Sequence, residues 1–250
     1  MMHSILIIGQ SNMAGRGFLN EAPKLDNPKL KVLRNGRWQP MYRPVNGDRP
    51  FSGSNLVESF ADKYANDFDV DTGVIPCADG GTSLNQWAVG GLLFDHACYM
   101  AELASRTSTI AAVLWHQGES DCADDLHPLY EEKLTVIIDA FRKKLDLCDV
   151  PFLLGGLGDY LKERNPNPNY QNIGYINNAL QRIAEKDSMI GFVPATGLGS
   201  NPDNLHFNAA ALYEFGLRYY DEFLKLRNPD KVYVEKPHPD DAFRTDIDSL

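Results

Sequence analysis

The sequence predicts a single-domain, three-layer α/β/α sandwich around a central parallel sheet. Short apolar runs alternate with amphipathic stretches, a pattern typical of βα units. The apolar runs are continuous instead of alternating, as expected for strands that are covered on both faces. The length of 250 residues allows one large domain with a sizeable core.

Five apolar runs are the expected strands. The first is followed directly by Gly9, and the fourth ends in Gly155 and Gly156, which suits a chain that turns at the end of a strand. In chain order, these runs are Ile5–Ile8, Val74–Ile75, Ile110–Trp115, Phe152–Leu154 and Ile190–Val193.

The stretches between these runs carry apolar side chains at helical spacing. The clearest is Tyr130–Leu145, in which all the large apolar residues fall on one helical face. Similar stripes predict helices over residues 56–64, 93–104 and 213–224, and Asn208 is expected to cap the last of them.

Two segments do not follow this alternation. Residues 18–54 contain five prolines, and an insertion of this length in a compact domain is usually a lid or a binding loop. Residues 228–250 are acidic and lack periodicity, so we expect a tail that lies extended over the surface or is partly mobile. The predicted organisation is therefore a domain over residues 1–227, with a lid at 18–54, followed by an acidic tail.

Composition and charge exclude several classes of protein. Lys and Arg number 24 against 34 Asp and Glu, and the resulting net charge of −10 argues against nucleic acid or an anionic membrane surface as partner. No apolar run is long enough to span a membrane. The four cysteines are isolated, and no cluster of His, Cys and carboxylates suggests a metal.

The amino-terminal segment bears on location. It lacks a basic region, and its apolar run of four residues is too short for a secretory signal, so the expected location is the cytoplasm. Isolated thiols fit the reducing conditions there. The sequence carries no signal for an oligomeric state.

Ser11 follows the first expected strand, where ligands gather in open α/β sheets. A helix that begins near Asn12 directs its free N–H groups to the same place. The alternative is that Ser11 only caps this helix, because serine is favoured at that position.

A serine nucleophile needs a base, and the base needs a carboxylate that fixes its tautomer. His206 lies three residues after Asp203, between the last strand and the last helix, a spacing that can bring the two side chains together. A surface turn over residues 201–204 explains the Asp and Asn residues but leaves His206 unexplained.

Polar residues also follow the second and third strands. The amide of Gln117 is of a kind that donates to a developing oxyanion. Glu119 and Asp121 follow the same strand and are further candidates for this site. For both, the alternative is that they only begin a helix. Gly80 and Gly81 permit close approach of a ligand to the backbone.

Four motifs in a fixed order carry a family resemblance. They are GQSNMAGR at residues 9–16, GGTSLNQW at 80–87, HQGESD at 116–121 and DNLHF at 203–207. Together the chain resembles the SGNH hydrolase superfamily, specifically the sialate O-acetylesterase-like branch that includes the acetylxylan esterases of carbohydrate esterase family six. The resemblance spans residues 5 to about 225.

This resemblance implies a flavodoxin-like fold and a serine esterase that removes acetyl groups from sugars without a cofactor. Asp203 would orient the catalytic histidine, with Glu119 as the rival acid, because the branch sometimes assigns that role to the glutamate of HQGE. The implied roles are Ser11 as nucleophile, His206 as base, and an oxyanion hole made by the backbone N–H of Ser11, that of Gly80 or Gly81, and the side chain of Gln117.

An acetylated saccharide is the expected substrate. Trp38, Arg43 and Trp87 are candidates for stacking on or gripping the sugar, with core packing as the alternative for each. Further substrate-binding candidates lie within the motifs, namely Gln10, Asn12 and His116.

Two other functions stay open at the level of sequence. One is a glycan-binding protein without turnover, although such a protein has no reason to hold serine, histidine and carboxylate together. The other is a broader lipase or thioesterase, which needs a long apolar groove that the polar, proline-rich segment 18–54 does not indicate.

Overall fold

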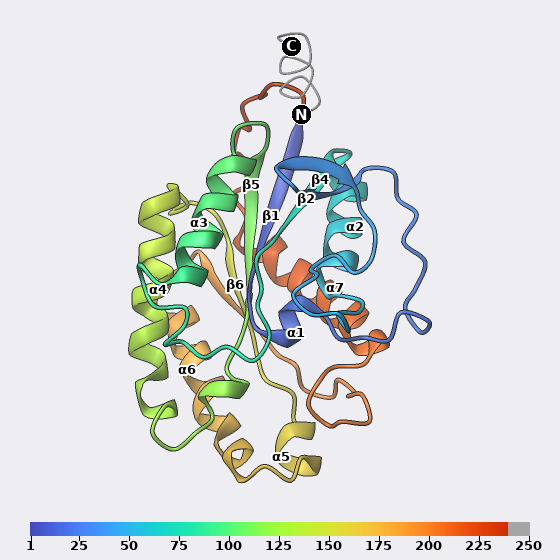
Figure 1. The fold of residues 1–250 in the computed structure, drawn as a ribbon. Helices are drawn as coiled ribbons and strands as arrows, with labels where there is room; N and C mark the ends of the chain where they lie inside the picture. Colours follow the sequence, from blue (N-terminus) through green and yellow to red (C-terminus); the bar gives the residue numbers. More distant parts are fainter. Residues whose placement is uncertain (240–250) are drawn as a thin grey trace.

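The computed structural model describes residues 1–239. It contains a seven-stranded sheet in the order β3-β2-β4-β1-β5-β6-β7 (Figure 1). All neighbouring strands are parallel except β2 and β3. The strands are β1 (Met2–Gly9), β2 (Leu30–Arg34), β3 (Arg37–Pro40), β4 (Asp71–Pro76), β5 (Thr109–His116), β6 (Phe152–Gly155) and β7 (Ile190–Val193).

Helices cover both faces of this sheet. α3, α4 and α6 lie on one face, and α2 and α7 lie on the other (Figure 1). The helices are α1 (Ser11–Ala14), α2 (Val57–Phe68), α3 (Leu92–Ala104), α4 (Tyr130–Leu145), α5 (Tyr160–Arg164), α6 (Ile173–Glu185) and α7 (Ala209–Leu226). The predicted three-layer α/β/α class is confirmed, and the cap is confirmed as well, because the Asn208 side chain accepts from the N–H of Ala211 at 2.8 Å.

Part of the expected lid belongs to the sheet. Within residues 18–54, β2 and β3 form an antiparallel hairpin at the sheet edge, so the sheet is not wholly parallel. The turn is Asn35-Gly36, with both residues at positive φ (51° and 75°), a sequence that favours tight hairpins. Leu30, Val32 and Leu33 are buried and anchor β2 in the core.

The first part of the expected acidic tail runs along the amino end of the sheet. Residues 228–239 form no helix or strand. The ring of Tyr233 packs 4.0 Å from that of His3, and Lys236 Nζ donates to the carbonyl of Ser105 at 2.6 Å. Residues 240–250, which complete the predicted tail, lie outside the described residues.

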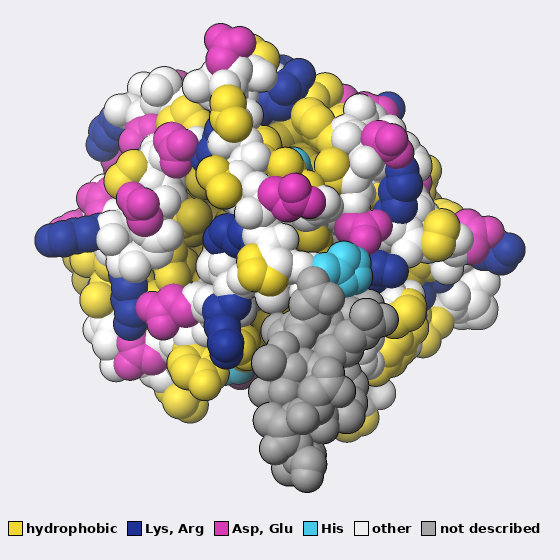
Figure 2. Space-filling model, turned by 90° about the horizontal axis from the view of Figure 1, so that it is seen from above, with side chains coloured by type: hydrophobic (Ala, Val, Ile, Leu, Met, Phe, Trp, Pro, Cys, Tyr) yellow, Lys and Arg dark blue, Asp and Glu magenta, His cyan; other side chains and the backbone are white. Residues whose placement is uncertain are grey.

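Three further features of the described residues are the surface charge, the length and apolar character of the helices, and the arrangement of possible metal ligands. On the end of the molecule shown in Figure 2, outside the grey residues, acidic and basic side chains are interspersed. No helix among residues 1–239 is both long and apolar enough to cross a membrane. In the same residues, no group of three or more His, Cys, Asp or Glu side chains is arranged to hold a metal ion.

The contact between α2 and α7 yields a test of the packing. A Cβ at Gly216 in α7 would lie 2.0 Å from the Leu56 carbonyl oxygen and 2.1 Å from Ser59 Oγ. We expect Gly216→Ala to lower the free energy of unfolding by about 1–3 kcal/mol, because overpacking forces the helices apart. Chemical denaturation measures this change.

Gly174→Ala is the matched control. Gly174 also lies in a helix, α6, but a Cβ there meets nothing within 4 Å. Its replacement should be neutral or stabilising by up to about 1 kcal/mol, because alanine favours the helix. Equal effects of the two substitutions would contradict the close packing of α2 on α7.

Candidate active site

Ser11 begins α1 at the carboxyl end of the central strand. Gly9 ends β1 with φ +133°, and a Cβ there would lie 2.1 Å from the carbonyl oxygen of His116. Only glycine therefore lets the end of β1 approach the end of β5 this closely. The N–H of Gln10 then donates to His116 at 2.9 Å, which fixes where Ser11 emerges.

Ser11 and His206 are brought together by the fold. Ser11 Oγ lies 3.0 Å from His206 Nε2, although the residues are 195 positions apart. On the other side of the imidazole, Nδ1 lies 2.7 Å from Asp203 Oδ2. The three side chains thus form a continuous hydrogen-bonded chain from hydroxyl to imidazole to carboxylate.

Asp203 is held by its own turn. Its Oδ1 accepts from the backbone N–H groups of Leu205 and His206 at 2.9 and 3.0 Å. Partial burial works to raise the pKa of Asp203, but these N–H groups and the His206 ring outweigh burial, so the pKa lies below its usual value. The ionised carboxylate keeps the imidazole proton on Nδ1 and leaves Nε2 free to accept from Ser11.

Glu119, the rival acid, lies behind Asn12 and has no hydrogen bond to His206 within the described chain. Asn12 Nδ2 donates to Glu119 Oε1 at 2.5 Å and to the carbonyl of Leu205 at 3.2 Å. Asn12 Oδ1 accepts from the N–H of Phe207 at 3.0 Å. Asn12 therefore binds the backbone on both sides of His206, and its hydrogen bond to Glu119 holds the Asn12 side chain in place.

The expected oxyanion donors separate into two groups. The backbone N–H groups of Ser11 and Gly81 donate to no residue in the described chain, and Gly81 is exposed with φ +77°. The N–H of Gly80, by contrast, donates to Asp48 Oδ2 at 2.9 Å. Gly80 lies against Ser11, since a Cβ there would be 3.4 Å from Ser11 Cβ.

The expectation that Gln117 donates to the oxyanion does not fit its position. Gln117 is wholly buried, and its Nε2 donates to Asp121 Oδ2, the Thr82 carbonyl and Gln10 Oε1 at 2.5, 3.0 and 3.2 Å. Gln10 Oε1 also accepts from the backbone of Gly118 at 3.3 Å, so it too is a structural residue and not a substrate ligand. Both amides tie the ends of β1 and β5 together.

His116 is likewise internal. Its side chain is fully buried, its Nε2 lies 3.1 Å from the Gly156 carbonyl, and the rings of Phe207 and Phe215 meet it edge-on. Burial lowers the pKa of His116, although Glu119 opposes the shift. This corrects the expectation that His116 contacts substrate.

The three predicted sugar-binding residues are structural as well. Trp87 is fully buried against Trp115. Trp38 Nε1 donates to Thr107 Oγ1 at 3.0 Å, just before β5 begins and hence at the end of the sheet opposite Ser11. Arg43 pairs with the buried Glu58 of α2 at 2.7 Å. The two tryptophans therefore serve packing, which was the alternative for them, and Arg43 serves an ion pair that joins the insertion to α2.

Sequence reasoning missed Asp48, which connects the insertion to the loops that hold Arg16 and Gly80. Both oxygens of Asp48 pair with Arg16, at 3.0 and 2.7 Å, and Oδ2 also receives the N–H of Gly80. No sequence pattern marks Asp48, because its role follows from the burial of Arg16, which is 6% exposed and needs a partner of opposite charge.

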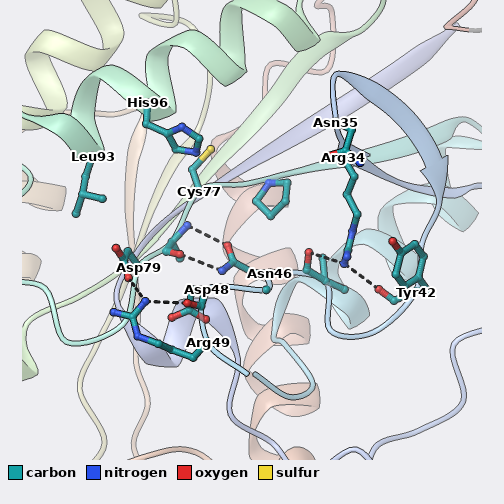
Figure 3. Close-up of a pocket in the computed structure, with 14 residues that line it drawn as sticks. Arg34, Asn35, Tyr42, Asn46, Asp48, Arg49, Cys77, Asp79, Leu93 and His96 are labelled. Carbon is teal, nitrogen blue, oxygen red and sulfur yellow. Dashed lines mark hydrogen bonds and ion pairs between the residues drawn. The ribbon is translucent and has the colours of Figure 1, made fainter. Parts of the chain in front are cut away.

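Two cavities flank these loops. The larger, about 510 Å³, lies between the insertion and α3, and its polar groups are largely paired with one another: Asn46 exchanges two hydrogen bonds with the backbone of Ala78, and Arg49 pairs with Asp79 (Figure 3). The smaller, about 420 Å³, is lined by His206 and Asp203 together with residues of the insertion. Of these two cavities, only the smaller is lined by His206.

Comparisons with known proteins show which proteins this chain is similar to. A protein of Arabidopsis thaliana named probable carbohydrate esterase is 28% identical over 244 residues, which cover 88% of this chain and 89% of that protein. A crystal structure of an Arabidopsis thaliana protein matches with a TM-score of 0.78 at 25% identity over 89% of this chain and 97% of that one. The structure of NanS matches in fold, with a TM-score of 0.70 at 17% identity over 90% and 97% of the two chains.

The family follows from a match over nearly the whole described chain. A family model described as "Carbohydrate esterase, sialic acid-specific acetylesterase" matches residues 1–225. This range contains all four motifs, from Ser11 to His206, and ends at α7. The chain therefore belongs to this family of carbohydrate esterases.

Proposed function

We propose that this protein is a serine esterase that removes O-acetyl groups from carbohydrates through an acetyl-enzyme intermediate. The observation that carries the proposal is the contact chain Ser11–His206–Asp203, with its distances of 3.0 and 2.7 Å. Family membership and the name of the Arabidopsis relative support a carbohydrate ester as substrate. Apart from the substrate and one water molecule, the proposed mechanism uses only side chains and backbone groups of this chain, without a cofactor.

In the first step, Ser11 Oγ attacks the acetyl carbonyl carbon while His206 Nε2 takes the hydroxyl proton. The negative charge that develops on the carbonyl oxygen needs fixed donors. The backbone N–H groups of Ser11 and Gly81 supply them, because neither has an acceptor in the described chain. Asp203 stabilises the imidazolium that forms, through its bond to Nδ1.

The tetrahedral intermediate then collapses. The bond from the acyl carbon to the sugar oxygen breaks, and His206 Nε2 gives its proton to that oxygen, so the sugar leaves as an alcohol. A water molecule next gives a proton to His206 and attacks the acetyl group on Ser11. Collapse of this second intermediate returns the proton to Ser11 and releases acetate.

Replacement of the nucleophile tests the proposal. Ser11→Ala should lower kcat for an aryl acetate by at least about 10⁴-fold, because the remaining donors alone cannot replace the covalent step. The melting temperature should stay near that of the wild type, since within residues 1–239 the only hydrogen bond of Ser11 Oγ is to His206. An organophosphonate should label the wild type at Ser11 and leave the variant unlabelled.

The opposite results have distinct meanings. Turnover by Ser11→Ala at the wild-type rate would refute the serine mechanism. Absence of both turnover and phosphonate labelling in the folded wild type would favour a glycan-binding protein without catalysis.

The identity of the acid is tested by a pair of carboxylate-to-amide variants. Asp203→Asn should lower kcat by about 10³–10⁴-fold, because the imidazole loses the charge that holds its tautomer. Glu119→Gln should lower kcat less than about tenfold, since a glutamine oxygen still accepts from Asn12. Steady-state kinetics on the same aryl acetate compares the two, and the reverse ranking would assign the acid to Glu119.

A further inference from the structure

We propose that the smaller cavity beside His206 binds the sugar that leaves, and that Phe51 is the surface on which this sugar stacks. This inference rests on the proposed esterase function and adds to it the location and chemistry of the alcohol site. The cavity, about 420 Å³, is called the alcohol cleft below. Its volume is in the range of small-molecule sites.

The position of His206 decides which half of the ester occupies the cleft. His206 Nε2 hands its proton to the oxygen of the leaving alcohol, so that oxygen must come within hydrogen-bond distance of the imidazole. His206 and Asp203 form part of the wall of the alcohol cleft. The remainder of the alcohol, the sugar ring, therefore extends into this cleft from the catalytic centre.

The outer wall of the cleft is apolar and open to solvent. Phe18, Leu19 and Phe51 line it and are 46%, 47% and 69% exposed. Large apolar side chains gathered at the rim of a cleft mark a binding surface. The C–H face of a sugar ring is apolar as well, and a flat aromatic ring is its natural partner.

The ring of Phe51 is in contact with the side chain of Arg16. The guanidinium carbon of Arg16 lies 5.3 Å from the centre of the Phe51 ring, a cation–π distance. Arg16 is itself fixed by its two-pronged ion pair with Asp48. This contact favours one position of the Phe51 ring before substrate arrives, which reduces the entropy cost of binding.

The inner wall offers two polar groups that have no partner in the described chain. Arg16 Nε and Asn201 Oδ1 are buried, in residues that are 6% and 5% exposed and line the same cleft. The amide of Asn201 is oriented by its Nδ2, which donates to the Arg16 carbonyl at 2.9 Å. Two residues of the cleft wall therefore carry one donor and one acceptor that have no partner in the described chain.

This polar pair distinguishes a sugar from an acyl chain. Sugar hydroxyls both donate and accept, so a hydroxyl that reaches this wall can pair with Arg16 Nε or with Asn201 Oδ1. A hydrocarbon chain in the same place would leave both groups buried and unpaired, which costs free energy. The combination of an aromatic wall with hydroxyl-matching groups favours the saccharide.

The test compares esters that differ from ethyl acetate either in the alcohol or in the acyl group. The substrates are a mono-O-acetylated methyl β-glucoside, ethyl acetate, whose alcohol has no ring to stack, and ethyl butyrate, whose acyl chain is longer. Phe51→Ala should lower kcat/KM for the glucoside ester about tenfold more than that for ethyl acetate. Phe51→Tyr should restore the glucoside activity, because its ring also stacks.

Tyr99→Ala is the matched control. Tyr99 is an aromatic residue of α3, 66% exposed, and is not part of the alcohol cleft. Its replacement should leave the ratio of the glucoside ester to ethyl acetate as in the wild type. Equal losses on glucoside ester and ethyl acetate in Phe51→Ala would overturn the proposal, and a selective loss on ethyl butyrate would make the cleft an acyl groove.

A binding measurement separates this inference from the esterase function. Saturation-transfer NMR with unacetylated methyl β-glucoside should show contact with the wild type and a weaker signal with Phe51→Ala. That result supports the alcohol cleft even if no ester is hydrolysed, in which case only the proposed function fails. Identical signals from wild type and Phe51→Ala would overturn the cleft assignment whatever the esterase activity.

Discussion

The hydrogen bond between Ser11 Oγ and His206 Nε2 is the contact on which the site depends, and it joins residues 195 positions apart. It forms because β1 lies in the middle of a sheet whose other central strands are parallel to it, so their carboxyl ends meet at one edge. Asn12 reinforces it by binding the backbone on both sides of His206. The buried carboxylate of Glu119 holds Asn12 in turn by accepting its hydrogen bond. Glu119 therefore supports the position of His206 without contacting it.

The sequence predicted the features that local pattern controls. Continuous apolar runs located the strands that follow the βα alternation, and the Asp203–His206 spacing was sufficient to bring carboxylate and imidazole into one turn. The hairpin of β2 and β3 was missed although its Asn35-Gly36 turn is a strong local signal. The high proline content of the surrounding segment predicts a loop instead.

The substrate-binding residues were harder to predict, because burial depends on the tertiary structure. Tryptophan suits both a sugar platform and a core, and only packing shows that Trp38 and Trp87 serve the core. Gln117 has the side chain of an oxyanion donor, but it is enclosed among Gln10, Thr82 and Asp121. Phe51 gave no signal in the sequence, since its exposure beside His206 arises only when the insertion folds back over α1.

The central claim is that an acetyl group passes through Ser11, and trapping that intermediate tests it most directly. The measurement is mass spectrometry of peptides from enzyme quenched by acid within the first turnovers of an acetylated saccharide. We expect one acetyl group on the peptide that contains Ser11, lost as turnover proceeds. An enzyme that hydrolyses the ester while this peptide stays unmodified at every time, or that carries the acetyl group on another residue, would contradict the account.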